Sequence, residues 1–165
     1  MPPTRPSSER GEVETLELKD AAQTLLDECR MVLPGIQAIF GFQLIAVFNQ
    51  RFEELASADK LLHLAALALV ALSAALVMTP AALHRQNGPR EMSDAFIESA
   101  SRLLMLAMPI LALGLAMDLY VIANMIIGSG EAVALAAGVL LAMIGLWIGF
   151  PQWARLRARA VIRNR

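Results

Sequence analysis

Four long apolar runs constrain the fold of this chain more than any other feature of its sequence. They cover residues 32–49, 61–83, 103–127 and 132–150. A helix needs about 20 mainly apolar residues to cross a bilayer, because the hydrocarbon core is about 30 Å thick. No water reaches the backbone in that core, so each run must satisfy its own hydrogen bonds by forming a helix. The runs therefore predict an all-α, four-helix transmembrane bundle.

The composition supports membrane spans over a large soluble core. Hydrophobic residues make up 57% of the 165 residues and charged residues 18%, whereas soluble domains average about 45–50% and 25%. Cys29 is the single cysteine, which excludes an intrachain disulfide and a cysteine-rich metal site. No metalloprotease, hydrolase, P-loop or paired-cysteine motif is present. We therefore expect no enzymatic activity, no metal and no cofactor.

The Lys and Arg residues predict the topology. Twelve of the 14 lie before the first run, between the second and third runs, or after the fourth run. Arg51 and Lys60 alone lie on the opposite side. The positive-inside rule then places both termini in the cytoplasm. His63 and His84 are thereby predicted on opposite sides of the membrane, which disfavours a paired-histidine metal or haem site within one chain.

The segment before the first span divides into two parts. Residues 1–11 are polar and rich in proline, which predicts a disordered N-terminus. Residues 12–31 are predicted to form an amphipathic cytoplasmic helix whose other face is acidic. Its apolar stripe is formed by Leu18, Ala22, Leu25, Cys29 and Val32. An acidic helix is poorly suited to an anionic membrane surface, so we expect it to pack on protein, either its own bundle or another subunit.

The tail, residues 151–165, is basic. Arg155, Arg159 and Arg163 share one helical face, and Trp153 stands where aromatic residues meet the membrane interface. Each such charge contributes about 1 kcal/mol of attraction to anionic lipid. The tail is therefore predicted to contact anionic lipids at the cytoplasmic face. Nucleic-acid binding is not expected, because no recognised motif accompanies the charges.

Two stripes of small residues predict helix–helix contacts. Small side chains let helices approach closely in lipid, where van der Waals packing replaces the hydrophobic effect. The fourth span contributes Gly138, Ala142, Gly145 and Gly149, and the second contributes Ala68, Ala71 and Ala75. The partner helices belong either to the same chain or to a second copy.

Asp118 is a carboxylate inside the third run. A charged Asp at the bilayer centre costs about 2.5–3.5 kcal/mol on insertion scales, so it needs a partner, a proton or water. Gly114 lies four residues earlier on the same face and leaves room for a neighbour. Gln43 matches Asp118 in depth, and His63 does so if the third span ends earlier. Gln37 and Asn124 are further polar candidates, and Asp118 serves either a structural role or an ion or proton pathway.

Two stretches, Leu25–Leu55 and Thr79–Gln86, carry a family resemblance. The first holds an acidic–x–Arg segment, an L-P-G-x-Q segment and an R-F pair, and the second a P-x-x-x-H-R segment. These positions are Glu28, Arg30, Leu33, Pro34, Gly35, Gln37, Arg51, Phe52, Pro80, His84 and Arg85. The chain resembles a family of small four-span bacterial membrane proteins catalogued as a domain of unknown function.

The resemblance implies a bacterial four-span protein, and we expect it in the cytoplasmic (inner) membrane. It implies no activity. It directs attention to the cytoplasmic ends of the first two spans, where Glu28, Arg30, His84 and Arg85 are predicted to form an ion-paired cluster. The sequence favours a non-enzymatic membrane subunit that acts through helix contacts in a homo-oligomer or a larger membrane complex. The alternative is a small oligomeric ion or proton channel or transporter that uses Asp118.

Overall fold

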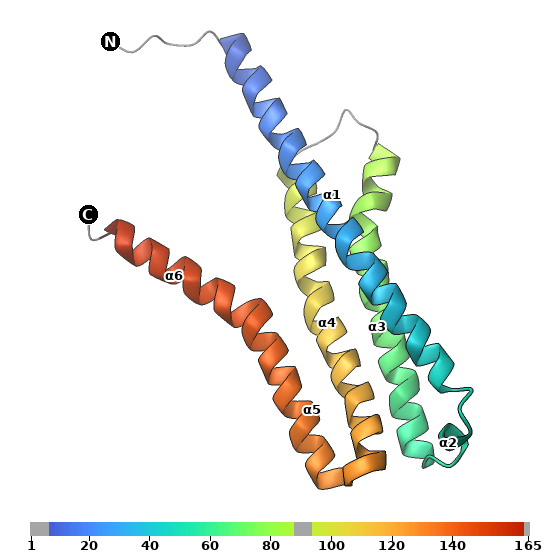
Figure 1. Ribbon diagram of the computed structural model, residues 1–165. Coiled ribbons are helices and arrows are strands. Elements are labelled where there is room, and N and C mark those ends of the chain that lie inside the picture. The colour runs from blue at the N-terminus through green and yellow to red at the C-terminus, as the bar shows by residue number, and fades with distance from the viewer. Residues whose placement is uncertain (1–6, 88–93, 164–165) are drawn as a thin grey trace. The chain divides into compact units, whose positions relative to one another are not determined.

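The computed structural model describes residues 7–87 and 94–163, and all the elements in these ranges are helices (Figure 1). The helices are α1 (Ser7–Ala46), α2 (Gln50–Glu53), α3 (Ser57–Asn87), α4 (Asp94–Ile127), α5 (Ser129–Ile144), a π-helical turn η1 (Gly145–Gly149) and α6 (Phe150–Arg163).

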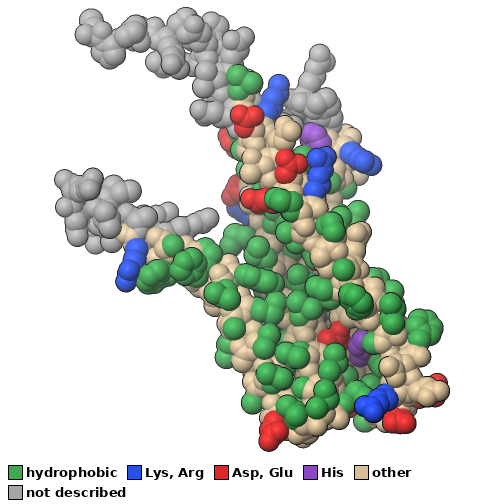
Figure 2. Space-filling view, in the orientation of Figure 1, with side chains coloured by type: hydrophobic (Ala, Val, Ile, Leu, Met, Phe, Trp, Pro, Cys, Tyr) green, Lys and Arg blue, Asp and Glu red, His purple; other side chains and the backbone are tan. Residues whose placement is uncertain are grey.

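Four helical stretches are long and apolar enough to cross a membrane. They are Leu18–Ala46, Ser57–Gln86, Asp94–Ile127 and Ser129–Ala154. Apolar side chains dominate the surface of these helices, as a lipid environment requires (Figure 2). The predicted all-α class with four membrane spans is confirmed.

α1 joins two segments that the sequence had separated. The amphipathic segment 12–31 and the first span form one continuous helix through Pro34. The helix already begins at Ser7, so the predicted disordered segment 1–11 is helical from residue 7, and residues 1–6 lie outside the described residues. Glu and Arg residues in this segment are good helix formers, and they allow the helix to extend toward the N-terminus.

The chain divides into two compact units. The first comprises the described residues of Met1–Ala38 and Ala74–Ala107, and the second comprises Ile39–Ser73 and the described residues of Met108–Arg165. In the first unit, α1 buries the centre of the predicted apolar stripe at Ala22, Leu25 and Cys29. Leu18 is half-buried and Val32 is exposed, so the buried face continues instead through Ile36.

In the second unit, segments of all four apolar helices pack as a bundle, and α3 and α4 lie close together at Gly114. A Cβ atom at this glycine would lie 3.1 Å from the carbonyl oxygen of Ala66 and 3.1 Å from Cγ2 of Val70. Ala66, Val70, Ala112 and Gly114 itself are all buried. The room that the sequence predicted beside Gly114 is therefore filled by the backbone of α3.

The packed face of α3 differs from the alanine stripe in the sequence prediction. Ala68, Ala71 and Ala75 are exposed. In the second unit α3 instead buries His63, Ala66, Val70 and Ser73. The polar side chains of His63 and Ser73 explain this difference. An imidazole and a hydroxyl find hydrogen-bond partners in protein but not in lipid, so these residues determine which face of the helix is buried.

The close approach at Gly114 makes a test of the α3–α4 contact. Gly114→Val places branched carbons against backbone at 3.1 Å, and overpacking of this kind costs about 1–3 kcal/mol. We expect a lower free energy of unfolding in a denaturant titration of the purified protein in micelles. Gly35→Val is the control, because a Cβ at Gly35 meets nothing within 4 Å. Equal stability of the two variants would contradict the close contact.

Candidate functional site

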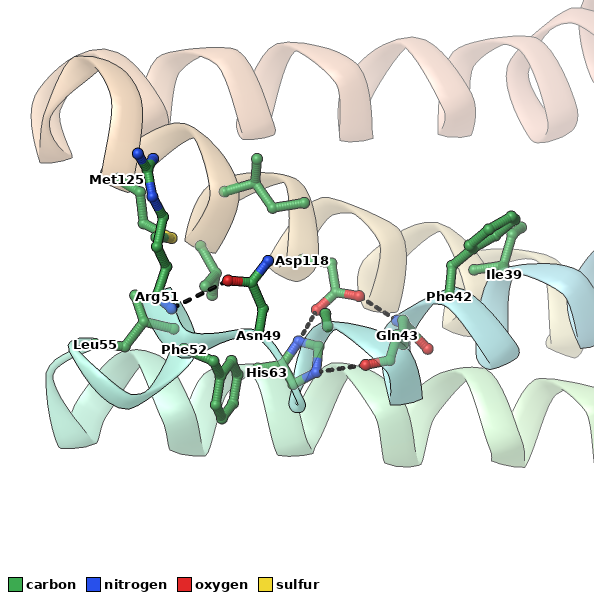
Figure 3. A pocket seen from close by; sticks show the side chains of 13 residues that line it. Ile39, Phe42, Gln43, Asn49, Arg51, Phe52, Leu55, His63, Asp118 and Met125 are labelled. Atoms are coloured by element: carbon green, nitrogen blue, oxygen red, sulfur yellow. Dashed lines mark hydrogen bonds and ion pairs between the residues drawn. The ribbon is translucent and has the colours of Figure 1, made fainter.

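Three side chains from three helices meet in the second unit: Gln43 of α1, His63 of α3 and Asp118 of α4 (Figure 3). Nε2 of Gln43 donates a hydrogen bond to Oδ2 of Asp118. Nδ1 of His63 lies 2.9 Å from Oδ1 of Asp118, and Nε2 of His63 lies 3.1 Å from the backbone carbonyl oxygen of Gln43. We call these three residues the polar cluster.

Local structure explains why the three side chains meet. Gln43 lies seven residues after Ile36, so it continues the buried face of α1. The connection from α1 to α3 is short and is held by its own hydrogen bonds. Oδ1 of Asn49 accepts from the backbone N–H of Arg51 at 3.1 Å, and Nζ of Lys60 donates to the carbonyl of Glu53 at 2.8 Å.

The hydrogen-bond geometry determines where protons lie in the polar cluster. A backbone carbonyl only accepts, so Nε2 of His63 carries a proton. The 2.9 Å contact between Nδ1 and Oδ1 of Asp118 needs a second proton, on one atom or the other. The pair is then either an imidazolium with a carboxylate or a neutral imidazole with a carboxylic acid. Both forms have zero net charge, which suits a site in an apolar membrane domain.

The polar cluster is well shielded. The side chains of His63 and Asp118 are 8% and 14% exposed, and Gln43 is 5% exposed. The ring of Phe52 packs edge-on against the imidazole, with 5.2 Å between ring centroids. Oε1 of Gln43 is buried and has no hydrogen-bond partner within the described residues. This amide oxygen is therefore a buried acceptor that the packing leaves unpaired.

A crevice of about 380 Å³ lies beside the polar cluster. Gln43, His63 and Asp118 form its polar wall. The rest of its lining is mainly apolar and is contributed by α1, by α4 and by the connection between α1 and α3. Ile39, Phe42, Ala46, Ile122 and Met125 are among these apolar residues.

The structure brings together some of the polar residues that the sequence proposed for a pathway. Asp118 contacts Gln43, which the sequence placed at the same depth in the membrane. It also contacts His63, which the sequence placed at that depth only if the third span ends earlier. Asn124 does not join them: its Nδ2 donates to Oδ2 of Asp59 at 3.2 Å. Six residues separate Asn124 from Asp118, which turns the two side chains to different faces of α4. Gln37 is exposed.

The predicted cluster of Glu28, Arg30, His84 and Arg85 is not formed, because none of the four makes an ion pair with another. NH1 of Arg30 instead pairs with Oδ1 of Asp27 at 3.2 Å, since a neighbour three residues away on the same helix is within reach. The ring of His84 lies 6.2 Å from that of Phe96. Glu28 and Arg85 are exposed.

The stripe of small residues on the fourth span is exposed. Cβ atoms at Gly138, Gly145 and Gly149 would meet nothing within 4 Å, and Ala142 is exposed as well. η1 lies at the end of this stripe, where the N–H of Phe150 bonds to the carbonyl of Gly145. Pro151 follows directly, and the wider turn gives its ring the room that a regular helix would deny.

The basic tail shows one contact that the sequence prediction lacked. The guanidinium of Arg157 lies 4.0 Å from the ring centre of the exposed Trp153, which is a cation–π geometry. The spacing of four residues on a helix was the available signal. The side chains of Arg155, Arg159 and Arg163 lie outside the described residues, so their lipid contact stays a prediction.

Four membrane-length helices, three of which share a buried polar cluster, define a helical multi-pass membrane protein. Residues 12–151 match the family of unknown function DUF6328, and the chain belongs to that family. The match includes both stretches on which the sequence resemblance rested. None of the curated proteins matches the chain. None of the solved structures matches it either.

The paired geometry predicts strong coupling between His63 and Asp118. Removing one partner of a buried pair costs about 3–5 kcal/mol, because the other is left unpaired. We expect His63→Leu and Asp118→Leu each to lower the free energy of unfolding by about this amount, and the double variant to lose much less than their sum. A denaturant titration of the four proteins in micelles measures this coupling.

The Asp59–Asn124 contact provides the matched control for this cycle. It is also a helix–helix hydrogen bond between α3 and α4, but it lies closer to the helix ends and has no third partner. Its coupling energy should stay below about 1 kcal/mol. Additive effects of the His63 and Asp118 substitutions would contradict the paired geometry.

Proposed function

We propose that this protein is a non-enzymatic membrane subunit that acts through helix–helix contacts, in a homo-oligomer or a larger membrane complex. We further propose the bacterial cytoplasmic membrane as its location, with both termini in the cytoplasm. The distribution of Lys and Arg supports this orientation, since 12 of 14 lie on one side of the four spans. Contact of the basic tail with anionic lipids belongs to the same proposal.

The observation that carries the proposal is the sparse packing of the fourth span. Only 6% of its apolar window is buried, against 28% and 33% for the second and third spans. Its buried residues in α5 are Ala132 and Ala136. Beyond them, the stripe formed by Gly138, Ala142, Gly145 and Gly149 has open space above it.

Small residues with open space above them favour a protein partner over lipid. Lipid chains gain nothing from a glycine face, whereas a second helix gains close backbone contact there. The π-helical turn adds a second argument, because such turns are frequent at functional sites. η1 covers Gly145–Gly149, the two glycines that form the GxxxG motif.

A leucine at Gly145 tests the helix contact. A Cβ atom at Gly145 meets nothing within 4 Å among the described residues, so the monomer with Gly145→Leu should fold as before. It fills the space that a partner helix needs, and we expect loss of the assembled species. Native mass measurement after extraction in a gentle detergent reads this out, for the protein alone and with co-purified partners.

Gly41→Leu is the control, because Gly41 also has open space around it and lies on α1. It should leave the assembled mass unchanged. A monomeric, partner-free wild-type protein, or an assembly that tolerates Gly145→Leu, would overturn the proposal.

A second candidate function is a proton or ion pathway, and the polar cluster favours it. If the shared proton left, the neutral imidazole would keep one N–H, and its lone pair would face either Oδ1 of Asp118 at 2.9 Å or the carbonyl oxygen of Gln43 at 3.1 Å, so one of the two contacts would become repulsive. Proton loss and opening of one contact of the polar cluster are therefore linked. Such a linkage is what a proton-coupled step between helices requires.

A proton pathway requires an exchangeable proton on Asp118, whereas the subunit role does not. Asp118→Asn removes the exchangeable charge while keeping the shape of the side chain. In proteoliposomes with a pH-sensitive dye inside, a pathway requires wild-type proton flux and its loss in Asp118→Asn, with assembly unchanged. Asp59→Asn is the matched control and should keep the flux. Absence of flux in the wild-type protein would eliminate this candidate.

A further inference from the structure

The crevice beside the polar cluster runs from the ends of α1 and α4 into the membrane domain. Arg51 lies at one end of it, in the connection that follows Ala46, the last residue of α1 (Figure 3). Ile39 lies at the other end, seven residues before Ala46, which is about 10 Å along the helix. The volume of about 380 Å³ falls in the range of about 300–1,000 Å³ that is typical of small-molecule sites.

Two residues that line the crevice are also exposed to the membrane. Phe42 of α1 and Ile122 of α4 are 73% and 57% exposed. Both belong to membrane-length helices, so the surface that they expose contacts hydrocarbon. An acyl chain of the bilayer therefore reaches the crevice from the side.

At membrane depth the crevice offers mainly apolar contacts. Gln43, His63 and Asp118 form the polar part of its wall, but each is at most 14% exposed. They bond to one another, and the unpaired oxygen of Gln43 is buried, so they present little polar surface to a ligand. The part of a ligand that lies at this depth is therefore a hydrocarbon chain.

Arg51 brings an unpaired charge to the end of the crevice. The hydrogen bond that Arg51 makes uses its backbone N–H, and its guanidinium has no partner among the described residues. The side chain extends from the connection toward Met125, near the end of α4 (Figure 3). A guanidinium pairs well with phosphate, because two of its N–H groups can donate to two phosphate oxygens at once.

The order of these groups along the crevice is the order of groups along a phospholipid. The cation lies at the helix ends, and the apolar lining begins below it. In a bilayer the phosphate lies in the head-group region, just outside the hydrocarbon core that holds the acyl chains. A phospholipid beside α1 and α4 therefore presents its phosphate and its chain at the matching levels.

We propose that the crevice binds a phospholipid. Its phosphate pairs with the guanidinium of Arg51, and one of its acyl chains lies along Ala46, Phe42 and Ile39. No described residue of α5 lines the crevice, so this proposal does not depend on the subunit role.

The phosphate, and not a net negative charge, is the group that this site selects. Glu53 and Glu54 lie in the same connection as Arg51 and are exposed. Two carboxylates beside one guanidinium oppose a head group with a net negative charge. A zwitterionic phospholipid is therefore the appropriate probe.

Photolabelling in dodecyl maltoside micelles tests the proposal. The probe is a phosphatidylcholine that carries a diazirine on one acyl chain, and mass spectrometry maps the labelled peptides. Label is expected in residues 39–55 and 118–125, which contain most of the lining. Dioleoyl phosphatidylcholine should compete with the probe about fivefold better than dioleoylglycerol, which has the same chains but no phosphate. This fold-change corresponds to about 1 kcal/mol for one cation near the membrane surface.

Substitutions of Arg51 separate its charge from its place in the structure. Arg51→Gln should remove the preference for phosphatidylcholine over dioleoylglycerol. Arg51→Lys should keep the preference, because Lys also binds phosphate, as a point charge. Arg85 is an exposed cation of α3 that does not line the crevice, so Arg85→Gln is the control and should change nothing.

Two alanine substitutions on α1 test the place of the acyl chain. Ala46 lines the crevice and is exposed, so Ala46→Phe occupies space that the chain needs. Ala38 is exposed and does not line the crevice, so Ala38→Phe is its control. Labelling should fall in Ala46→Phe and persist in Ala38→Phe.

Each other outcome overturns the proposal. Equal competition by dioleoylglycerol would mean that the crevice takes any hydrocarbon chain. Stronger competition by oleate than by dioleoyl phosphatidylcholine would mean that Arg51 pairs with a fatty-acid carboxylate. Label spread over all four spans, or unchanged in Ala46→Phe, would mean that there is no site. None of these results bears on the Gly145→Leu experiment.

Discussion

The hydrogen bond between Asp118 and His63 is the constraint on which the second unit depends. A carboxylate among apolar helices is tolerated only if its charge is cancelled and its oxygens are bonded. His63 bonds one carboxyl oxygen and Gln43 bonds the other, so each of three helices contributes one group. Because His63 also bonds the carbonyl of Gln43, the three contacts close a ring that holds α1, α3 and α4 together.

This ring also explains which face of α3 is packed. His63 has to face Asp118, and the rotation that achieves this buries Ala66, Val70 and Ser73 on the same side. The alanines at 68, 71 and 75 then face outward. Gly114 completes the arrangement, because a side chain at this position would meet the carbonyl of Ala66, and its absence lets α4 lie close enough to α3 for the carboxylate to reach the imidazole.

The polar cluster and the fourth span leave two different surfaces for the membrane to fill. Beside the polar cluster is a crevice of about 380 Å³ whose lining is mainly apolar. On the fourth span is an open stripe of small residues, which suits another helix. The first surface is concave and polar at one point, whereas the second is an apolar stripe, so the two select different partners.

The sequence by itself determined the membrane spans and the residues that need partners. Apolar run length sets the span, and Asp118 and Gln43 could be matched in depth because rise per residue is constant along a helix. The tertiary structure decided how each helix is rotated about its axis and which side chains contact one another. Alanines on any face of α3 can pack against another helix, so the stripe of Ala68, Ala71 and Ala75 could not show which face is buried. The contact of His63 with Asp118 determines that face. Glu28, Arg30, His84 and Arg85 failed to cluster because an exposed charge finds a nearer partner on its own helix, as Arg30 does with Asp27. Depth follows from counting along one chain segment, but rotation depends on the contacts of all the helices at once.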